Sequence, residues 1–181
     1  MVVCEVATIF AQRYHSLDAT QIIDFKGDRF VYNNQEVKLG PKTFFLDGQL
    51  SDEQIKGQPY VFNSFQKAAE QFIDGSESEP MRVYIAPYVY WIDDPNDMEI
   101  KKGKNGREPF GMVVKCQNLH LIGLNDNPRN VVLASWRGQT QGAIGNFTMF
   151  DFWGDGMVVK NLTMGNFCNV DLEYPLKKEL S

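Results

Sequence analysis

The chain has 181 residues, of which 43% are hydrophobic, 13% aromatic and 23% charged, a composition typical of one globular domain with or without an extension. Its net charge is −5, and its only basic cluster, Glu99 to Arg107, contains two glycines and is typical of a solvated loop. These features argue against a nucleic-acid partner. No run of about 18 apolar residues occurs, so the sequence predicts no membrane span.

The first twelve residues, "MVVCEVATIFAQ", are mostly apolar and allow two interpretations. They resemble the end of a secretory signal that would be cleaved near Ala11, although Glu5 interrupts the apolar run and no basic region precedes it. The alternative is a first β-strand.

The three cysteines, Cys4, Cys116 and Cys168, have no metal-ligand spacing and form no CxxC motif. The sequence therefore predicts no metal site, no cofactor and no disulfide framework. Cys116 and Cys168 each lie beside an apolar run, where a free cysteine usually serves as a small buried hydrophobe.

Residues 1–60 are expected to form a β-rich extension. The segment "RFVYNNQEVKL" predicts two strands joined by a turn at Asn33 and Asn34, and "KTFFLDGQL" predicts a strand followed by an Asp-Gly turn.

One helix is predicted, from about Ser64 to Ile73, with Asn63 or Ser64 as its N-cap and Gly75 as its end. Its apolar residues recur with helical spacing and define a single face. These residues are Phe65, Ala68, Ala69, Phe72 and Ile73.

After Pro80 the chain consists of short β-prone runs separated by Gly, Asn, Asp and Pro, among them "MRVYIAP", "NLHLIGL", "NVVLAS" and "FTMFDF". No gap between the runs contains a helix long enough for a βαβ crossover. A sandwich and a parallel β-solenoid therefore both fit this region.

The repeated pentapeptide "GMVVK", at 111–115 and again at 156–160, favours the solenoid. An Asn-Leu segment follows each copy, beginning at Asn118 and at Asn161, which are 161 − 118 = 43 residues apart. This spacing fits two coils of about 20 residues or one coil enlarged by a loop. We expect Leu119 and Leu162 to enter one core between parallel strands, and the two asparagines to stack at successive corners. The predicted helix would cover the first coil.

Residues 62–169 resemble pectin methylesterases. The helix with Gln66 and the segment "VYIAPYVY", with Tyr84, Ile85, Pro87 and Tyr90, match the opening of that family. "NLHLIG" and "GDGMVVKNLTMGN" match its next two strands in the same order. Tyr88 replaces a glycine of the family pattern, and residues 93–107 look like an inserted loop.

The resemblance implies a mainly β fold, a right-handed parallel β-helix (solenoid) of which residues 61–181 are the first coils. It also implies secretion or periplasmic export, and hydrolysis of methyl esters on an acidic plant polysaccharide (pectin, galacturonan). The family's catalytic motifs, of the types GxQDT, DFIFG and GRpW, follow the last matched strand and are absent here. No catalytic residue is therefore assigned, and we expect this chain by itself to be inactive.

The polar segment "SWRGQTQG" is the candidate substrate-binding site. Trp136 can stack on a sugar ring, and Arg137 can pair with a uronate carboxylate. Gln139 and Gln141 can bind hydroxyl groups. The competing interpretation is an ordinary corner loop with Trp136 packed against the flank.

Other polar residues are interpreted structurally. Asp151 and Asp155, four residues apart, suggest an acid/base pair or, more simply, turn chemistry in "FDFWGDG". His120 alternates with Leu119 and Leu121, which predicts a surface position. Two rivals to the esterase hypothesis stay open, namely a polysaccharide lyase or glycoside hydrolase on the same scaffold, and a non-catalytic glycan-binding or structural solenoid.

Overall fold

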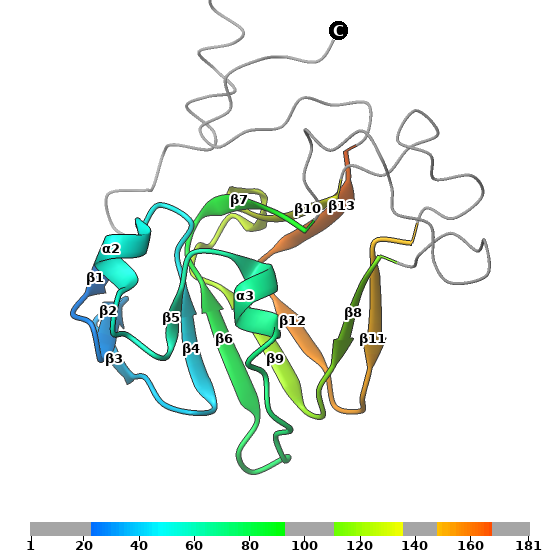
Figure 1. Cartoon of the computed structure of the whole chain (residues 1–181), viewed down its shortest axis with the longest axis horizontal. Coiled ribbons are helices and arrows are strands. Elements are labelled where there is room, and N and C mark those ends of the chain that lie inside the picture. Colours follow the sequence, from blue (N-terminus) through cyan, green and yellow to red (C-terminus); the bar gives the residue numbers. More distant parts are fainter. Residues whose placement is uncertain (1–22, 93–110, 136–147, 168–181) are drawn as a thin grey trace, which may run out of the picture.

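The computed structural model describes residues 23–92, 111–135 and 148–167, and within them the chain is mainly β, as expected. The helical elements there are short: α2 (Asp52–Ile55), α3 (Phe65–Ala69) and the 3-10 helix η2 (Pro128–Asn130). The strands form one antiparallel sheet and three parallel sheets (Figure 1).

The largest sheet has five parallel strands in the order β12-β9-β6-β4-β5. They are β4 (Thr43–Leu46), β5 (Val61–Phe62), β6 (Met81–Ile85), β9 (Leu119–Gly123) and β12 (Val158–Lys160). The register aligns Thr43 with Arg82, Arg82 with His120, and His120 with Val158. These four residues therefore form one row across the sheet.

Two smaller parallel sheets complete the fold. One contains β7 (Tyr88–Trp91), β10 (Val131–Ser135) and β13 (Thr163–Asn166), and the other pairs β8 (Met112–Lys115) with β11 (Phe150–Trp153). The chain visits the three sheets in turn, as β6-β7-β8, then β9-β10-β11, then β12-β13. It returns to the five-stranded sheet after 119 − 81 = 38 residues and again after 158 − 120 = 38 residues.

Alternation along the strands builds the core. In β6 and β9 the first, third and fifth residues are buried and the residues between them are half-buried. Leu121, which is fully buried, lies in register between Val83 and Val159. One apolar cluster gathers side chains from all three parallel sheets, including Val83, Val114 and Leu133.

The predicted parallel pairing of the Val/Leu-rich runs is confirmed wherever the structure describes them. Leu119 is buried in the main cluster, and Leu162 packs against the same cluster, as predicted. His120 is half-buried between two buried leucines, which confirms its predicted surface position. Cys116 is buried, also as predicted.

The two copies of the pentapeptide do not stack on one another, which corrects the expected coil length and the expected asparagine stack. The first copy forms β8 and the second forms β12, and these strands belong to different sheets. The two copies share a local geometry instead, because Asn118 (φ 48°) and Asn161 (φ 53°) each form a left-handed corner after the strand. Asn161 lies against Gly123, where an added Cβ would meet the Asn161 carbonyl oxygen.

The predicted helix begins as expected and ends early. Ser64 is its N-cap, but α3 stops at Ala69 with Glu70 as its C-cap, so Gly75 does not end it. Phe65 and Ala68 are fully buried and Phe72 is partly buried, whereas Ile73 is 45% exposed and lies off the predicted apolar face. The sequence analysis missed α2, although Ser51 and Gln54 form a capping box there.

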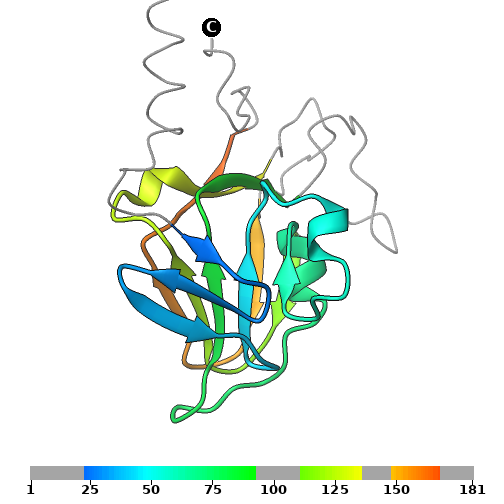
Figure 2. The ribbon, with the colours of Figure 1, turned by 90° about the vertical axis from the view of Figure 1, so that its left-hand side faces the viewer.

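The antiparallel sheet contains β1 (Asp24–Phe25), β2 (Arg29–Tyr32) and β3 (Gln35–Lys38). The predicted turn is confirmed, since Asn33 and Asn34 both have positive φ. This sheet lies over the outer face of the five-stranded sheet (Figure 2), where Phe30 stacks on Phe45 at 5.0 Å between ring centroids. The expected boundary between residues 60 and 61 falls inside the five-stranded sheet, because β4 pairs with β6.

Several sequence-based interpretations concern residues outside the described ranges. They are the signal remnant at 1–12, the loop at 93–107, Cys4 and Cys168, and the substrate-binding residues Trp136, Arg137, Gln139 and Gln141.

Candidate functional site

A surface cavity of about 320 Å³ lies where the antiparallel sheet meets the start of β4 and β6. Residues 38–43, Glu79 and Arg82 line it, and we call it the cationic hollow. Three of its side chains, Lys38, Lys42 and Arg82, are cationic, and one, Glu79, is anionic. The formal charge of the lining is therefore +2 (3 − 1), in a chain whose net charge is −5.

A tight turn shapes one wall of the cationic hollow. The Thr43 N–H donates to the Gly40 carbonyl at 2.9 Å, and Pro41 occupies the first central position of the turn, where its fixed φ is favourable. The Arg82 N–H then donates to the Lys42 carbonyl at 2.9 Å. This bond joins the turn to β6, so the backbone positions of both cationic residues are set by the parallel sheet.

The opposite wall comes from the loop before β6. The Ser76 hydroxyl accepts a hydrogen bond from the Glu79 N–H at 3.1 Å, which holds the loop closed. Glu79 then reaches Lys42, with 2.9 Å between Oε2 and Nζ. Lys42 is thus paired, whereas Lys38 and Arg82 form no ion pair within the described part of the chain.

His120 is the neighbour of Arg82 on the next strand of the same row. Partial burial lowers the pKa of the His120 imidazole, and the positive charge of Arg82 lowers this pKa further. The imidazole is consequently neutral at pH 7. It can donate or accept a hydrogen bond at the edge of the cationic hollow without adding charge.

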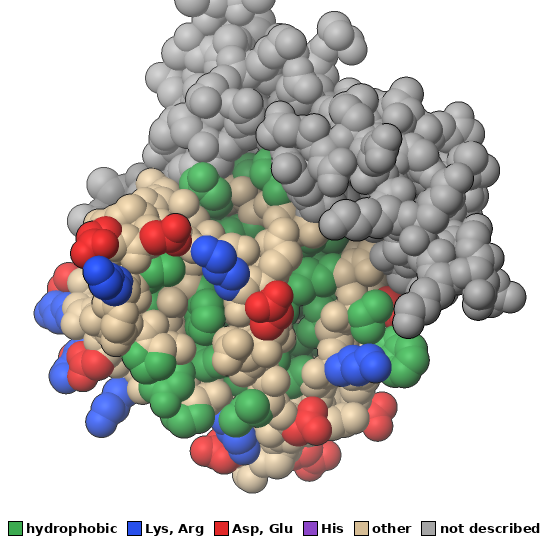
Figure 3. Space-filling model, viewed as in Figure 1, with side chains coloured by type: hydrophobic (Ala, Val, Ile, Leu, Met, Phe, Trp, Pro, Cys, Tyr) green, Lys and Arg blue, Asp and Glu red, His purple; other side chains and the backbone are tan. Residues whose placement is uncertain are grey.

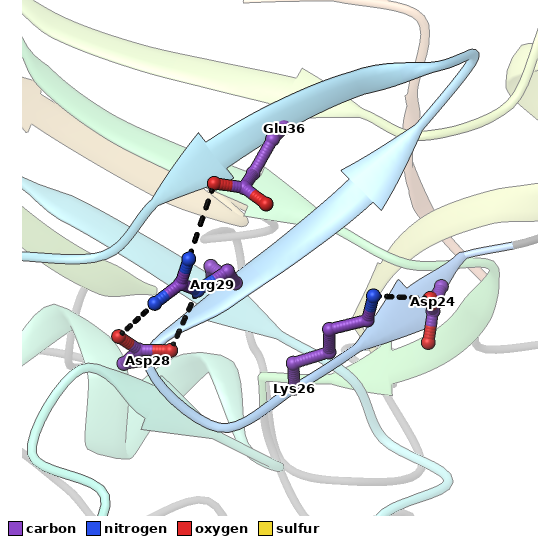
Figure 4. A network of polar contacts seen from close by, with 5 residues as sticks. All are labelled: Asp24, Lys26, Asp28, Arg29 and Glu36. Atoms are coloured by element: carbon purple, nitrogen blue, oxygen red, sulfur yellow. Dashed lines mark hydrogen bonds and ion pairs between the residues drawn. The ribbon is translucent and has the colours of Figure 1, made fainter.

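Charges on the adjacent antiparallel sheet are arranged differently. Arg29 pairs with Asp28 at 2.9 Å and with Glu36 at 3.3 Å, and Lys26 pairs with Asp24 at 3.1 Å (Figure 4). The hydrogen bonds from Arg29 lower the pKa of the Asp28 carboxyl. On the face seen in Figure 3, positive and negative side chains are likewise interspersed. The excess of cations in the cationic hollow is therefore a local feature.

A second polar surface lies on the outer face of β8 and β11. Trp153 is 57% exposed, and the Lys115 ammonium lies 4.6 Å from its ring centroid. The two residues are in register on neighbouring strands. An exposed indole beside a cation can stack on a sugar ring and attract an acidic substituent of that ring.

The two aspartates of "FDFWGDG" occupy different local environments. Asp151 lies within β11, and Asp155 lies in the bend that follows, between Gly154 and Gly156, both of which have positive φ. The Asp155 N–H donates to the Gln117 side chain at 2.8 Å. The turn interpretation of Asp155 is therefore confirmed.

The sequence analysis did not single out Lys38, Lys42, Arg82 or Trp153. A usable signal existed for Arg82, since alternation in "MRVYI" places it on the face opposite Met81, Val83 and Ile85. For the two lysines there was none. They approach Arg82 only because β4 pairs with a strand about 38 residues later in the chain.

Comparison of the chain with protein-family models, with curated proteins and with solved structures finds no match. Among the described residues, no group of three or more His, Cys, Asp or Glu side chains is arranged to hold a metal ion. The helices in the same residues are all too short or too polar to cross a membrane.

Proposed function

We propose that this chain is the N-terminal part of a secreted carbohydrate-active protein, similar to pectin methylesterases, that acts on galacturonan methyl esters. The observation that carries the proposal is the in-register parallel pairing of three sheets that the chain visits in turn. That arrangement agrees with the scaffold that the family resemblance implies.

The finer fold we propose is a right-handed parallel β-helix. The return from β6 to β9 and from β9 to β12 takes 38 residues each time, and parallel strands of one sheet are joined by right-handed crossovers in about 98% of proteins. Each turn would then contribute one strand to each sheet. The helix α3, with Phe65 fully buried, would close the first turn.

The far end of the stack supports the view that further turns follow. Val159 continues the fully buried row of Val83 and Leu121, yet it is 46% exposed. Met164 and Phe152 continue the buried rows of Leu133 and Val114 and are only partly buried. An additional turn would bury these three residues and pair the free strand edges.

Trp153 and Lys115 support a glycan ligand, because their indole and ammonium groups suit the ring face and the carboxylate of a uronic acid. The same pair also favours the second candidate function, a non-catalytic glycan-binding solenoid. Both candidates predict binding, and only the parent of an esterase gains activity when the chain is extended.

Affinity electrophoresis of residues 1–181 in gels containing methylated pectin, polygalacturonate or neutral dextran tests the binding. We expect the two galacturonan gels to retard the chain and dextran not to retard it. Trp153→Ala should weaken the retardation, while Val113→Ala, at a site of similar exposure on β8, should not. Equal mobility in all three gels would refute the proposal.

The activity of the same preparation distinguishes the rivals. We expect no methanol release, no unsaturated product and no new reducing ends above a heat-killed control. Methanol release would assign catalysis to this chain itself and direct attention to Asp151 and Asp155. Unsaturated products would favour the lyase hypothesis, and new reducing ends the hydrolase hypothesis.

A further inference from the structure

We propose that the cationic hollow is a binding site for an oxyanion, with Arg82 and Lys38 as its primary ligands. The anion is a carboxylate, sulfate or phosphate group, either attached to a glycan or free. The inference rests on the geometry of the cationic hollow and holds whether or not the proposed esterase relationship does.

Arg82 is suited to the role because its surroundings hold it in place and leave its guanidinium available. Its backbone lies in the middle of the five-stranded sheet, bonded on one side through Lys42 and in register with His120 on the other. Within the described residues the guanidinium forms no ion pair and no side-chain hydrogen bond. A planar guanidinium in this state can donate two parallel hydrogen bonds to an oxyanion.

Lys38 supplies a second unpaired cation from the end of β3, across the cavity lining. Lys42 supplies a third, which Glu79 partly neutralises at 2.9 Å. An anion entering the cationic hollow would therefore meet two uncompensated charges and one carboxylate that repels it. This composition gives the site a distinctive signature, since removal of a cation and removal of Glu79 should act in opposite directions.

Ordinary surface cations on the neighbouring sheet provide the contrast. Arg29 and Lys26 are satisfied by carboxylates on their own or adjacent residues and are not part of the cavity (Figure 4). Lys26→Gln is therefore the matched control for Lys38→Gln and Arg82→Gln, because it removes one charge without touching the cationic hollow. Glu53→Gln is the matched control for Glu79→Gln, since Glu53 pairs with Lys56 elsewhere.

The experiment is an NMR titration of the full chain with two probes, inorganic sulfate and trigalacturonate, monitored at the amides of Thr43, Arg82 and His120. We expect saturable shifts at these amides. Arg82→Gln should weaken binding about tenfold or more, and Lys38→Gln several-fold, because charge-assisted hydrogen bonds are lost. Glu79→Gln should tighten binding roughly threefold, and the two control variants should stay within about twofold of the original chain.

The probes separate the sources of the anion. Sulfate binding without trigalacturonate binding assigns a free oxyanion, which supports the inference and gives no support to a galacturonan ligand. Trigalacturonate binding that its methyl ester lacks assigns a glycan carboxylate. The absence of saturable shifts with both probes would overturn the inference. So would equal effects of Lys38→Gln and Lys26→Gln, and since Lys38 is exposed, this comparison remains valid even if Arg82→Gln unfolds the chain.

Discussion

His120 and Arg82 illustrate how a single neighbour changes the chemistry of a residue. His120 has two buried leucines beside it in the strand and a guanidinium beside it in the sheet. Burial is the larger cause of its lowered pKa, and the charge of Arg82 is the second. Both disfavour the imidazolium, so the electrostatics of this row depend on which residue β6 presents to β9.

We predict that Arg82→Gln raises the pKa of His120 toward its ordinary value of about 6.5, because the substitution removes the repelling charge and leaves burial unchanged. Titration of the His120 ring protons by NMR measures the change. Lys67→Gln, on α3, is the control that should leave this pKa unaltered. An unchanged pKa in Arg82→Gln would show that burial alone sets it.

The sign of the effect on stability follows from the direction of the shift. Because the folded state holds His120 at a lowered pKa, the unfolded chain takes up the proton first as the pH falls. The contribution of His120 to stability is therefore present above the ordinary histidine pKa and is lost as the pH falls through the folded-state pKa. Arg82→Gln should narrow this pH window.

At the scale of elements, α3 is shorter than its hydrophobic pattern suggested. Phe65 contacts Phe72 and Phe150, with ring centroids 6.1 Å and 5.7 Å away, and so joins the helix to β11. The chain beyond Ala69 leaves the helix, and Ile73 turns toward solvent. The covering role of the element therefore depends on its first turn.

We predict that Phe65→Ala lowers the free energy of unfolding by about 3–5 kcal/mol, the usual effect of truncating a fully buried phenylalanine. Phe72→Ala should cost less because Phe72 is only partly buried, and Ile73→Ala should stay within about 0.5 kcal/mol. Denaturant unfolding measures all three. A loss below about 1 kcal/mol for Phe65→Ala would refute the view that α3 covers the core.

The two asparagine corners share a backbone conformation but differ in their contacts. The Asn118 amide donates to the Gly75 carbonyl at 3.2 Å and so ties the corner after β8 to the loop before β6. Asn161 is exposed, and no side-chain hydrogen bond is found for it among the described residues.

We predict that Asn118→Gly destabilises the fold by about 0.5–1.5 kcal/mol more than Asn161→Gly. Glycine adopts a positive φ without strain at either corner, and its effect on the unfolded chain is the same in both variants. The difference between the two isolates the hydrogen bond to Gly75. Equal unfolding midpoints would mean that this bond contributes nothing measurable.

At the scale of the whole molecule, the stack is asymmetric. The end with β4 and β5 is covered by α3 and carries the antiparallel sheet, with Phe44, Phe45 and Phe65 all buried. The end with β12 has three exposed strand residues, and Val158 and Val159 are 41% and 46% exposed. An apolar strand edge of this kind favours pairing with another chain.

We predict that residues 1–181 self-associate through this edge and that Val159→Lys reduces the association, since a lysine at a strand edge opposes pairing. Val113→Lys is the control, because Val113 is 44% exposed and lies outside the five-stranded sheet. Sedimentation velocity over a range of concentrations measures the effect. Equal association in both variants would place the contact elsewhere.

The sequence by itself determined the local features of this protein. Alternation of apolar residues in "MRVYI" and "NLHLI" specified which side chains are buried, because successive strand residues point to opposite faces. The left-handed turn at Asn33 and Asn34 and the helix start at Ser64 followed from backbone preferences of single residues. The family resemblance added an expected scaffold, and its substrate and secretion remain proposals.

Only the tertiary structure decided which strands pair and which polar residues meet. The two "GMVVK" segments are identical, yet one pairs with β11 and the other with β9, since their partners depend on the lengths of the connections between strands. Lys38, Glu79 and Arg82 line one cavity for the same reason. Parallel pairing brings together residues about 40 positions apart, and no local pattern encodes that offset, because it is fixed by burial of the shared core.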